Sequence, residues 1–313
     1  MSTDRKLITV VTPCYNEEGN VEPLYDAVRR VFDGLPRYRY RHLFIDNASK
    51  DGTRPILRRL AERDPNVQVI FNARNFGHIR SPYHALLQAE GDAVVLMAAD
   101  FQDPPELLAE FVPKWEQGYK VTLGVKVTSE EPGLFYRTRS RYYRMLAQIA
   151  DIELVSHATG FGLFDRTVIE HLRRINDPYP YFRGLLADIG YEVARVPFDQ
   201  PLRKRGVSSN NFYTLYDIAF LGIVSHSRVP LRLATMVGFV MAALSMFAAF
   251  VYLLAKLVFW NSFELGLAPI LIGFFFISAI QLFFVGILGE YIGSIWTHIR
   301  RHPHVFENER LNF

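Results

Sequence analysis

The chain of 313 residues has a formal net charge of only +3, and half of its residues are hydrophobic. So small a charge gives no electrostatic reason to expect a nucleic-acid partner, and we expect none. The single cysteine, Cys14, excludes an intrachain disulfide framework and is compatible with a reducing cytosol. A chain of this length can hold one large domain and a further, smaller unit.

Apolar runs and helical periodicity alternate four times in the first third of the chain. The patterns predict strands at Leu7–Thr12, Leu43–Ile45, Val67–Phe71 and Ala93–Met97. They predict helices at Val21–Phe32, Arg54–Glu62, Ile79–Gln88 and Glu106–Trp115. Further strands are expected at Lys120–Val127 and Glu192–Phe198. The alternation predicts an α/β fold with a mostly parallel sheet and helices on both faces.

Each of the first four predicted strands ends in a polar cluster. The clusters are Pro13–Glu18, Asp46–Thr53, Asn72–Gly77 and Ala98–Glu106. Ligands of open α/β sheets bind at the carboxyl ends of the strands, so the four clusters are expected to form one site.

The segment after the fourth strand is the centre of this predicted site. Asp100, Gln102 and Asp103 place hard oxygen donors in a short loop. Such donors suit Mg²⁺ or Mn²⁺, and these ions suit a diphosphate. The alternative is an acidic turn that only caps the following helix.

The other clusters allow more than one interpretation. Asp46 can accept a hydrogen bond from a base N–H group. Glu17 can bind ribose hydroxyls, or it can complement the dipole of the next helix, and the residue alone does not separate these. Arg74 and Asn75 open a helix whose free N–H groups favour phosphate. Asp51 is interpreted as structural, because Gly52 and Thr53 already explain it as a turn and helix cap.

Four motifs together resemble a known family. They are Pro13-x-Tyr15-Asn16-Glu17, Asp46 with Ser49-x-Asp51-Gly52-Thr53, Arg74-Asn75-x-Gly77, and Asp100-x-Gln102-Asp103-Pro104-Pro105-Glu106. This combination resembles the family 2 glycosyltransferases. More narrowly, it resembles the polyprenyl-phosphate branch, which includes dolichol-phosphate mannose synthase and the bacterial undecaprenyl-phosphate glycosyltransferases.

The resemblance implies a GT-A type, nucleotide-sugar-binding domain with assigned site residues. The nucleotide-binding residues would be Pro13, Tyr15, Glu17, Asp46, Arg74, Asn75 and Ala99. Asp100 and Gln102 would hold the divalent metal, Mg²⁺ or Mn²⁺, and the catalytic residues would be Asp100, Asp188, Arg203 and Arg205.

Two positions depart from the family pattern. Ala98 stands where a metal-binding Asp is usual, so either metal binding is weak or Asp103 or water replaces that ligand. Asn47 stands where a second acid often follows Asp46.

Several segments are candidates for binding the acceptor and the diphosphate. The predicted helix Leu134–Ala150 places Arg137, Arg141 and Arg144 on one face, with Ser140 beside them. This face suits an anionic lipid head group, or it is simply a solvated charged face. By resemblance, Thr159–Arg166 forms a wall of the acceptor site. Arg203 and Arg205 lie in an Arg-x-x-Gly-x-Ser-like segment that would close over the diphosphate, or would only meet lipid head groups.

The last third of the chain indicates membrane attachment. Asn211–Ser227 reads as an interfacial amphipathic helix, and the apolar runs Leu233–Phe259 and Leu267–Ile295 each exceed the roughly 20 residues that span a bilayer. Two buried core helices are the alternative. The flanking arginines Arg228, Arg232, Arg300 and Arg301 place both chain ends in the cytoplasm.

The expected organisation is therefore a cytoplasmic domain, 1–210, an interfacial helix, 211–228, a transmembrane hairpin, 229–296, and a cytoplasmic tail, 297–313. The expected location is the bacterial inner membrane.

The expected activity is inverting, metal-dependent transfer of one sugar from a nucleotide sugar, taken as UDP-linked, to a polyprenyl phosphate. The expected partners are the nucleotide sugar, the lipid phosphate, the membrane and further copies of the chain, with a tetramer suggested by relatives. One alternative is an enzyme that extends a growing glycan. Another is a catalytically silent membrane protein that binds nucleotide sugars or scaffolds a partner, which Ala98 would favour.

Overall fold

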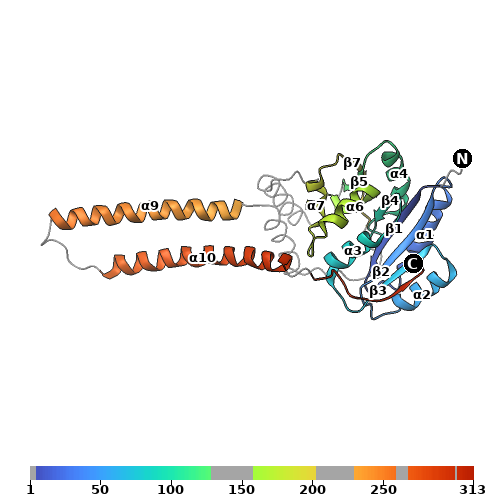
Figure 1. Cartoon of the computed structure of the whole chain (residues 1–313), viewed down its shortest axis with the longest axis horizontal. Helices are drawn as coiled ribbons and strands as arrows, with labels where there is room; N and C mark the ends of the chain where they lie inside the picture. The colour runs from blue at the N-terminus through green and yellow to red at the C-terminus, as the bar shows by residue number, and fades with distance from the viewer. Residues whose placement is uncertain (1–4, 128–157, 202–228, 259–266, 300–301) are drawn as a thin grey trace.

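A single mixed sheet runs through the α/β domain of the computed structural model, which describes residues 5–127, 158–201, 229–258, 267–299 and 302–313 (Figure 1). Within these residues the sheet has eight strands in the order β7-β5-β6-β4-β1-β2-β3-β8. Four of them form its parallel centre: β1 (Leu7–Cys14), β2 (Arg39–Asp46), β3 (Val67–Asn72) and β4 (Ala93–Leu96).

The remaining strands extend the sheet on both sides. β5 (Val121–Lys126) and β7 (Val193–Phe198) are parallel to each other. β6 (Ala158–Asp165) lies antiparallel between β4 and β5, and β8 (Glu307–Leu311) lies antiparallel against β3 at the opposite edge. β1 to β5 and β7 therefore all run in the same direction, and their carboxyl ends lie along one edge of the sheet. This edge is formed by strand ends and crosses the sheet from β7 to β3.

Helices cover both faces of the sheet, as the alternating pattern predicts. α1 (Val21–Asp33), α2 (Thr53–Arg63) and α4 (Leu108–Glu116), which the short helix η1 (Pro105–Leu107) precedes, pack over one core. α3 (Gly77–Gln88), α6 (Arg166–Ile175) and α7 (Phe182–Ile189) pack over a second core. Neighbouring residues of β1 alternate between them: Val10 faces the first core and Val11 the second. The predicted α/β fold with a mostly parallel central sheet is confirmed.

The strand bounds differ from prediction where polar residues continue a ladder. β2 begins at Arg39, four residues before the predicted Leu43, because pairing with β1 extends from Leu7↔Arg39 to Cys14↔Asp46. The segment of β6 was expected only as a wall of the acceptor site, and no strand was predicted in the tail, 297–313, so β8 was missed. The sequence Glu-Asn-Glu-Arg-Leu of β8 lacks an apolar run, since an edge strand keeps one side in water.

Gly162 of β6 is a position where the sheet requires glycine. A Cβ atom there would lie 2.3 Å from the Thr122 carbonyl oxygen and 2.8 Å from a methyl carbon of Leu123. We expect Gly162→Ala to reduce the free energy of unfolding by about 1–3 kcal/mol through overpacking against β5. Thermal melting measures the change. Gly238→Ala is the matched control, because a Cβ atom at Gly238 meets nothing within 4 Å. Equal melting temperatures for both variants would contradict this account.

Two long helices extend from one end of the α/β domain (Figure 1). They are α9 (Val229–Val258) and α10 (Leu267–Ile299), and they carry exposed apolar side chains such as Phe239, Met246 and Leu282. Within the described residues, one stretch, Phe276–Thr297 of α10, is long and apolar enough to cross a membrane. The corresponding stretch of α9, Leu233–Phe247, is shorter, so the predicted pair of spans is not confirmed.

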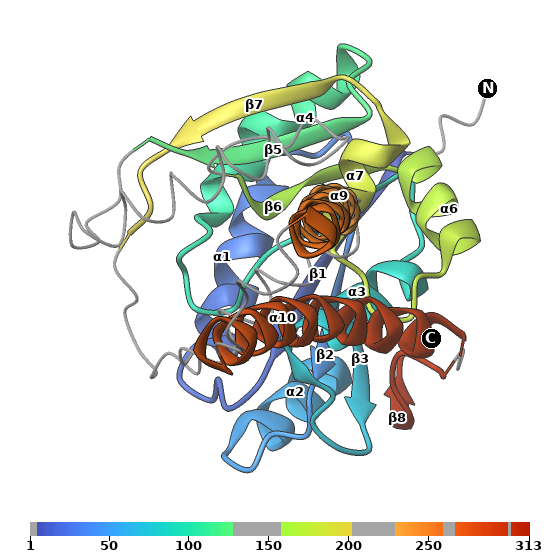
Figure 2. The same cartoon turned by 90° about the vertical axis from the view of Figure 1, so that its left-hand side faces the viewer.

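Figure 2, viewed toward the helices, shows the sheet and its covering helices behind α9 and α10. The chain beyond α10 returns along the α/β domain to form β8 beside β3 (Figure 1). The predicted interfacial helix, Asn211–Ser227, and the turn between the two apolar runs lie outside the described residues.

Candidate active site

The loop after β4 contains the predicted metal ligands. Asp100 is buried, and its Oδ1 accepts the backbone N–H of Gln102 at 3.2 Å, so the two predicted ligands share one turn. Phe101 between them has a φ of 60°, which is unusual for a bulky residue. Strained backbone of this kind persists where the surroundings fix it, commonly at functional sites.

Asp103 has a different task in the same loop. Its Oδ2 accepts the backbone N–H of Ala98 at 2.9 Å. Burial raises the pKa of the Asp103 carboxyl to about 6, and the nearby charge of Asp100 adds to that increase. Asp103 therefore fixes the loop through the backbone of the very residue that replaces the family's usual Asp.

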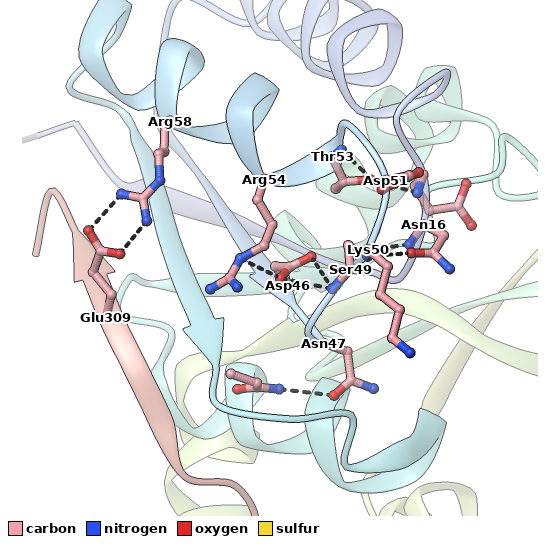
Figure 3. A network of polar contacts seen from close by, with 12 residues as sticks. Asn16, Asp46, Asn47, Ser49, Lys50, Asp51, Thr53, Arg54, Arg58 and Glu309 are labelled. Carbon is pink, nitrogen blue, oxygen red and sulfur yellow. Dashed lines mark hydrogen bonds and ion pairs between the residues drawn. The ribbon is translucent and has the colours of Figure 1, made fainter.

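The loops after β1 and β2 are bound tightly to each other. Asn16 donates its N–H to the Ser49 hydroxyl at 2.9 Å, and its side-chain oxygen accepts the N–H of Lys50 at 2.8 Å (Figure 3). The N–H of Glu17 bonds to the Thr53 hydroxyl at 2.8 Å. These contacts place Glu17 beside the start of α2.

Asp51 joins the same two loops. Its carboxylate accepts N–H bonds from Glu18 at 3.1 Å and from Thr53 at 3.0 Å. These bonds support the structural interpretation of Asp51, since both oxygens are used to hold backbone.

Asp46 is a fully buried acid at the carboxyl end of β2. Its oxygens accept the Ser49 N–H at 3.2 Å, and Oδ2 lies 3.3 Å from Nε of Arg54 (Figure 3). Burial raises the pKa of the Asp46 carboxyl, while the bonds from Ser49 and the charge of Arg54 oppose the increase. Arg54, which the sequence did not single out, thus supplies the counter-charge that a buried carboxylate needs.

Carboxylates of the loops after β1 and β2 lie within electrostatic reach of the Cys14 thiol. The pKa of the Cys14 thiol is raised well above its ordinary value, first by burial and then by the charges of Asp46, Glu17 and Asp51. β4 pairs with β1 at Leu96↔Val11, and the Met97 N–H bonds to the Val11 oxygen at 3.0 Å. The loop with Asp100 therefore begins beside the end of β1, where Cys14 lies. The structure therefore brings the loops with Glu17, Asp46 and Asp100 to one edge of the sheet.

Left-handed backbone marks the same three loops. Asn16, Ala48 and Phe101 have φ values of 56°, 61° and 60°, and each lies in one of the loops after β1, β2 and β4. This conformation costs of order 1 kcal/mol or more for Ala48 and Phe101, and less for Asn16, because asparagine tolerates it. Three such residues at one edge of the sheet indicate that the surrounding structure holds these loops in a fixed conformation.

Asn47 organises the loop that follows β3. Its amide nitrogen donates to Asn75 Oδ1 at 2.9 Å and to the Gly77 oxygen at 3.1 Å. Its amide oxygen accepts from Asn72 at 3.1 Å and from the Phe76 N–H at 2.9 Å. A carboxylate could not make the two donor contacts, which gives a physical reason for Asn where a second acid is often found.

The predicted phosphate-facing residues have structural contacts as well. Asn75 Oδ1 accepts the Gly77 N–H at 2.8 Å and so satisfies one free donor at the start of α3. The Arg74 guanidinium lies 4.0 Å from the ring centre of Phe76. Tyr15 is exposed at the same edge, whereas Pro13 lies within β1 and Ala99 is buried.

Other predicted residues are placed elsewhere or are not described. Asp188 is exposed in the last turn of α7, just before the amino end of β7, which is the end opposite to the one where Asp100 follows β4. The structure does not bring it beside the other residues, and its role stays a prediction. Arg137, Ser140, Arg141, Arg203 and Arg205 lie outside the described residues.

Lys126 is a further candidate residue of this site that was not predicted from the sequence. It ends β5, and its charge lowers the pKa of Asp103 against the effect of burial. Its place at the carboxyl end of a parallel strand was the available signal.

The donor set fits a divalent metal shared with a ligand. Within the described residues no group of three His, Cys, Asp or Glu side chains could hold a metal ion. One carboxylate and one amide, from Asp100 and Gln102, match the way Mg²⁺ is held by one or two carboxylates together with substrate phosphates and water. The site thus suits a metal that arrives with a diphosphate.

Comparison with known proteins identifies the family of the chain. Residues 9–173 match the family described as glycosyl transferase family 2. The chain is 32% identical over 311 residues to the uncharacterized glycosyltransferase YkcC of Bacillus subtilis, covering 97% of this chain and 96% of the relative. It is 31% identical over 305 residues to the bactoprenol glucosyl transferase of Shigella phage SfV, covering 97% of this chain and 99% of the relative.

A solved structure also overlaps with most of the chain. The mannosyltransferase PcManGT of Pyrobaculum calidifontis, in complex with GDP-Man and Mn²⁺, is 17% identical, with a TM-score of 0.47 over 94% of this chain and 87% of that one. The family match spans β1 to α6, the part that contains the converging loops. The chain therefore belongs to glycosyl transferase family 2, and its α/β domain is GT-A-like.

Proposed function

We propose that this protein transfers a single sugar, with inversion, from a UDP-linked sugar to a polyprenyl phosphate at the cytoplasmic face of a membrane. The observation that carries the proposal is the convergence of the Glu17, Asp46 and Asp100 loops at one sheet edge. The relative from Shigella phage SfV, named a bactoprenol glucosyl transferase, supports a lipid-phosphate acceptor, since the similarity covers nearly the whole of both chains.

The donor would lie across the three loops. Asp46 would accept an N–H group of the base, and Glu17 would bind the ribose. Asp100 and Gln102 would hold Mg²⁺ or Mn²⁺ against the diphosphate. The metal would supply positive charge to the leaving diphosphate. Arg203 or Arg205 would supplement that charge, because guanidinium groups bind phosphate oxygens bidentately.

The reaction needs little acid–base chemistry from the protein. The attacking group is an oxygen of the lipid phosphate, which is largely ionised at neutral pH because its second pKa is about 6. It would displace the nucleoside diphosphate at the anomeric carbon in one step, with inversion. Catalysis would then rest on positioning both substrates and on stabilising the leaving group.

The helices α9 and α10 would hold this site near the lipid. Their exposed apolar side chains favour a membrane environment, and the stretch Phe276–Thr297 of α10 is long enough to span one. We propose that α9 spans as well, which leaves both chain ends on the cytoplasmic side. The arginines at 137 and 141, with Ser140, would then meet the acceptor phosphate.

A transfer assay with the full-length protein tests the proposal. The protein in detergent is incubated with Mn²⁺, undecaprenyl phosphate and a panel of UDP- and GDP-linked sugars, and the lipid product is identified by mass spectrometry. A singly glycosylated lipid phosphate from a UDP sugar is the expected result. Nucleotide binding without transfer to any lipid would overturn the proposal in favour of a silent binding protein. Transfer only to an oligosaccharide would favour the glycan-extending enzyme.

A further inference from the structure

The C-terminal strand contributes an acid to a row of side chains that crosses three strands. The register pairs Asp46 of β2 with Phe71 of β3, and Phe71 with Glu309 of β8. Residues paired across neighbouring strands project from the same face of a sheet. Asp46, Phe71 and Glu309 therefore form a row with a carboxylate at each end.

Helix α2 covers this row with two arginines. Arg54 and Arg58 are one helical turn apart, and their guanidinium carbons lie 4.8 Å and 4.7 Å from the ring centre of Phe71. Arg54 pairs with Asp46, and Arg58 pairs with Glu309 through two N–H···O bonds, one of them 2.7 Å long (Figure 3). Each arginine thus has its own carboxylate.

The two pairs are electrostatically connected. The hydrogen bonds from Arg58 lower the pKa of the Glu309 carboxyl, and the charge of Arg54 adds to that decrease. The charge of Arg54 also opposes the increase that burial causes in the pKa of Asp46, so Arg54 is within reach of both acids. Without the Glu309 charge, Arg58 would keep Glu62 of its own helix as an acid within electrostatic reach. It would also be free to turn across the Phe71 ring, which Arg54 already contacts, toward the carboxylate of Asp46. That carboxylate would be held more tightly by arginine and would be less available to another donor.

We propose that Glu309 is a positioning residue for recognition of the nucleobase. By engaging Arg58, it leaves Asp46 paired with Arg54 alone among the arginines that the structure describes, so that one guanidinium group rather than two competes with the base for the Asp46 carboxylate. The inference rests on the proposed role of Asp46 in donor binding. It makes the C-terminal strand, which follows α10, a part of the donor site.

Titration calorimetry with UDP and Mn²⁺ tests this on the full-length protein. We expect Glu309→Gln to weaken UDP binding about tenfold, the usual size of a lost charge-assisted hydrogen bond, while pyrophosphate with Mn²⁺ binds as to the wild type. Adding Arg58→Gln removes the surplus guanidinium. The double variant is therefore expected to regain UDP affinity to within about twofold.

A matched control removes a carboxylate from an arginine pair outside the row. Glu170→Gln breaks the 2.9 Å contact between Arg166 and Glu170 on α6 and is expected to leave UDP binding unchanged. A purely structural role for Glu309 predicts a further loss in the double variant, which would overturn the inference. Unchanged UDP binding in Glu309→Gln would also overturn it, with the proposed function intact. Failure of the wild type itself to bind UDP would instead contradict the proposed function.

Discussion

Asp100→Asn is expected to abolish sugar transfer without unfolding the protein. Asp100 is the one carboxylate among the two proposed metal ligands, and replacing it with an amide removes the negative charge that retains the cation. We expect turnover to fall by about 10²–10³-fold or more, the size typical of losing a group that stabilises the leaving charge. The variant keeps its oxygen toward the Gln102 N–H, so the turn itself is preserved. Steady-state transfer and calorimetry with Mn²⁺ and UDP measure the effect.

Asp26→Asn is the control for this substitution. Asp26 is an exposed acid on α1, and the same change there is expected to leave both turnover and metal dependence unaltered. The melting temperatures of both variants should match that of the wild type. Near-normal transfer by Asp100→Asn would remove the main support for the metal site.

Asn47→Asp is expected to destabilise the loop after β3 and to weaken donor binding. The change converts two donated hydrogen bonds, to Asn75 and to the Gly77 oxygen, into oxygen–oxygen contacts in a buried place. Two lost bonds and a buried charge without a new donor cost about 2–4 kcal/mol, or a fall of roughly 5–10 °C in melting temperature. Thermal melting and UDP titration measure the two effects.

Asn66→Asp provides a comparison at an exposed position. Asn66 donates its side-chain amide to Asp64 at 2.9 Å, so the same substitution also sets two acids against each other, but in water. Solvent screening should limit its cost to about 1 kcal/mol or less. If both variants melted at the same temperature, the buried contacts of Asn47 would not be what holds the loop.

The alternating pattern was sufficient to predict the parallel centre of the sheet, because a buried parallel strand needs a continuous apolar run. Leu7–Thr12 and Val67–Phe71 show this: both lie within the observed β1 and β3. The edge strand β8 has no such run, since two of its five residues, Asn308 and Arg310, are exposed to water. The strand with which it pairs, β3, lies more than 230 positions earlier in the chain. Local pattern does not encode a contact of that separation.

The candidate site, like the sheet, was predictable from the sequence only in part. The residue types at each strand end determined that acids and amides would gather at one edge, and the family motifs named Glu17, Asp46 and Asp100 among them. Only the tertiary structure decided how those groups are held, because their partners come from other elements. Arg54 reaches Asp46 from α2, the Thr53 hydroxyl at the start of α2 accepts the N–H of Glu17, and Asn47 spans from the end of β2 to the start of α3. Chemistry is carried by residue type, whereas charge balance and orientation depend on neighbours that only folding brings together.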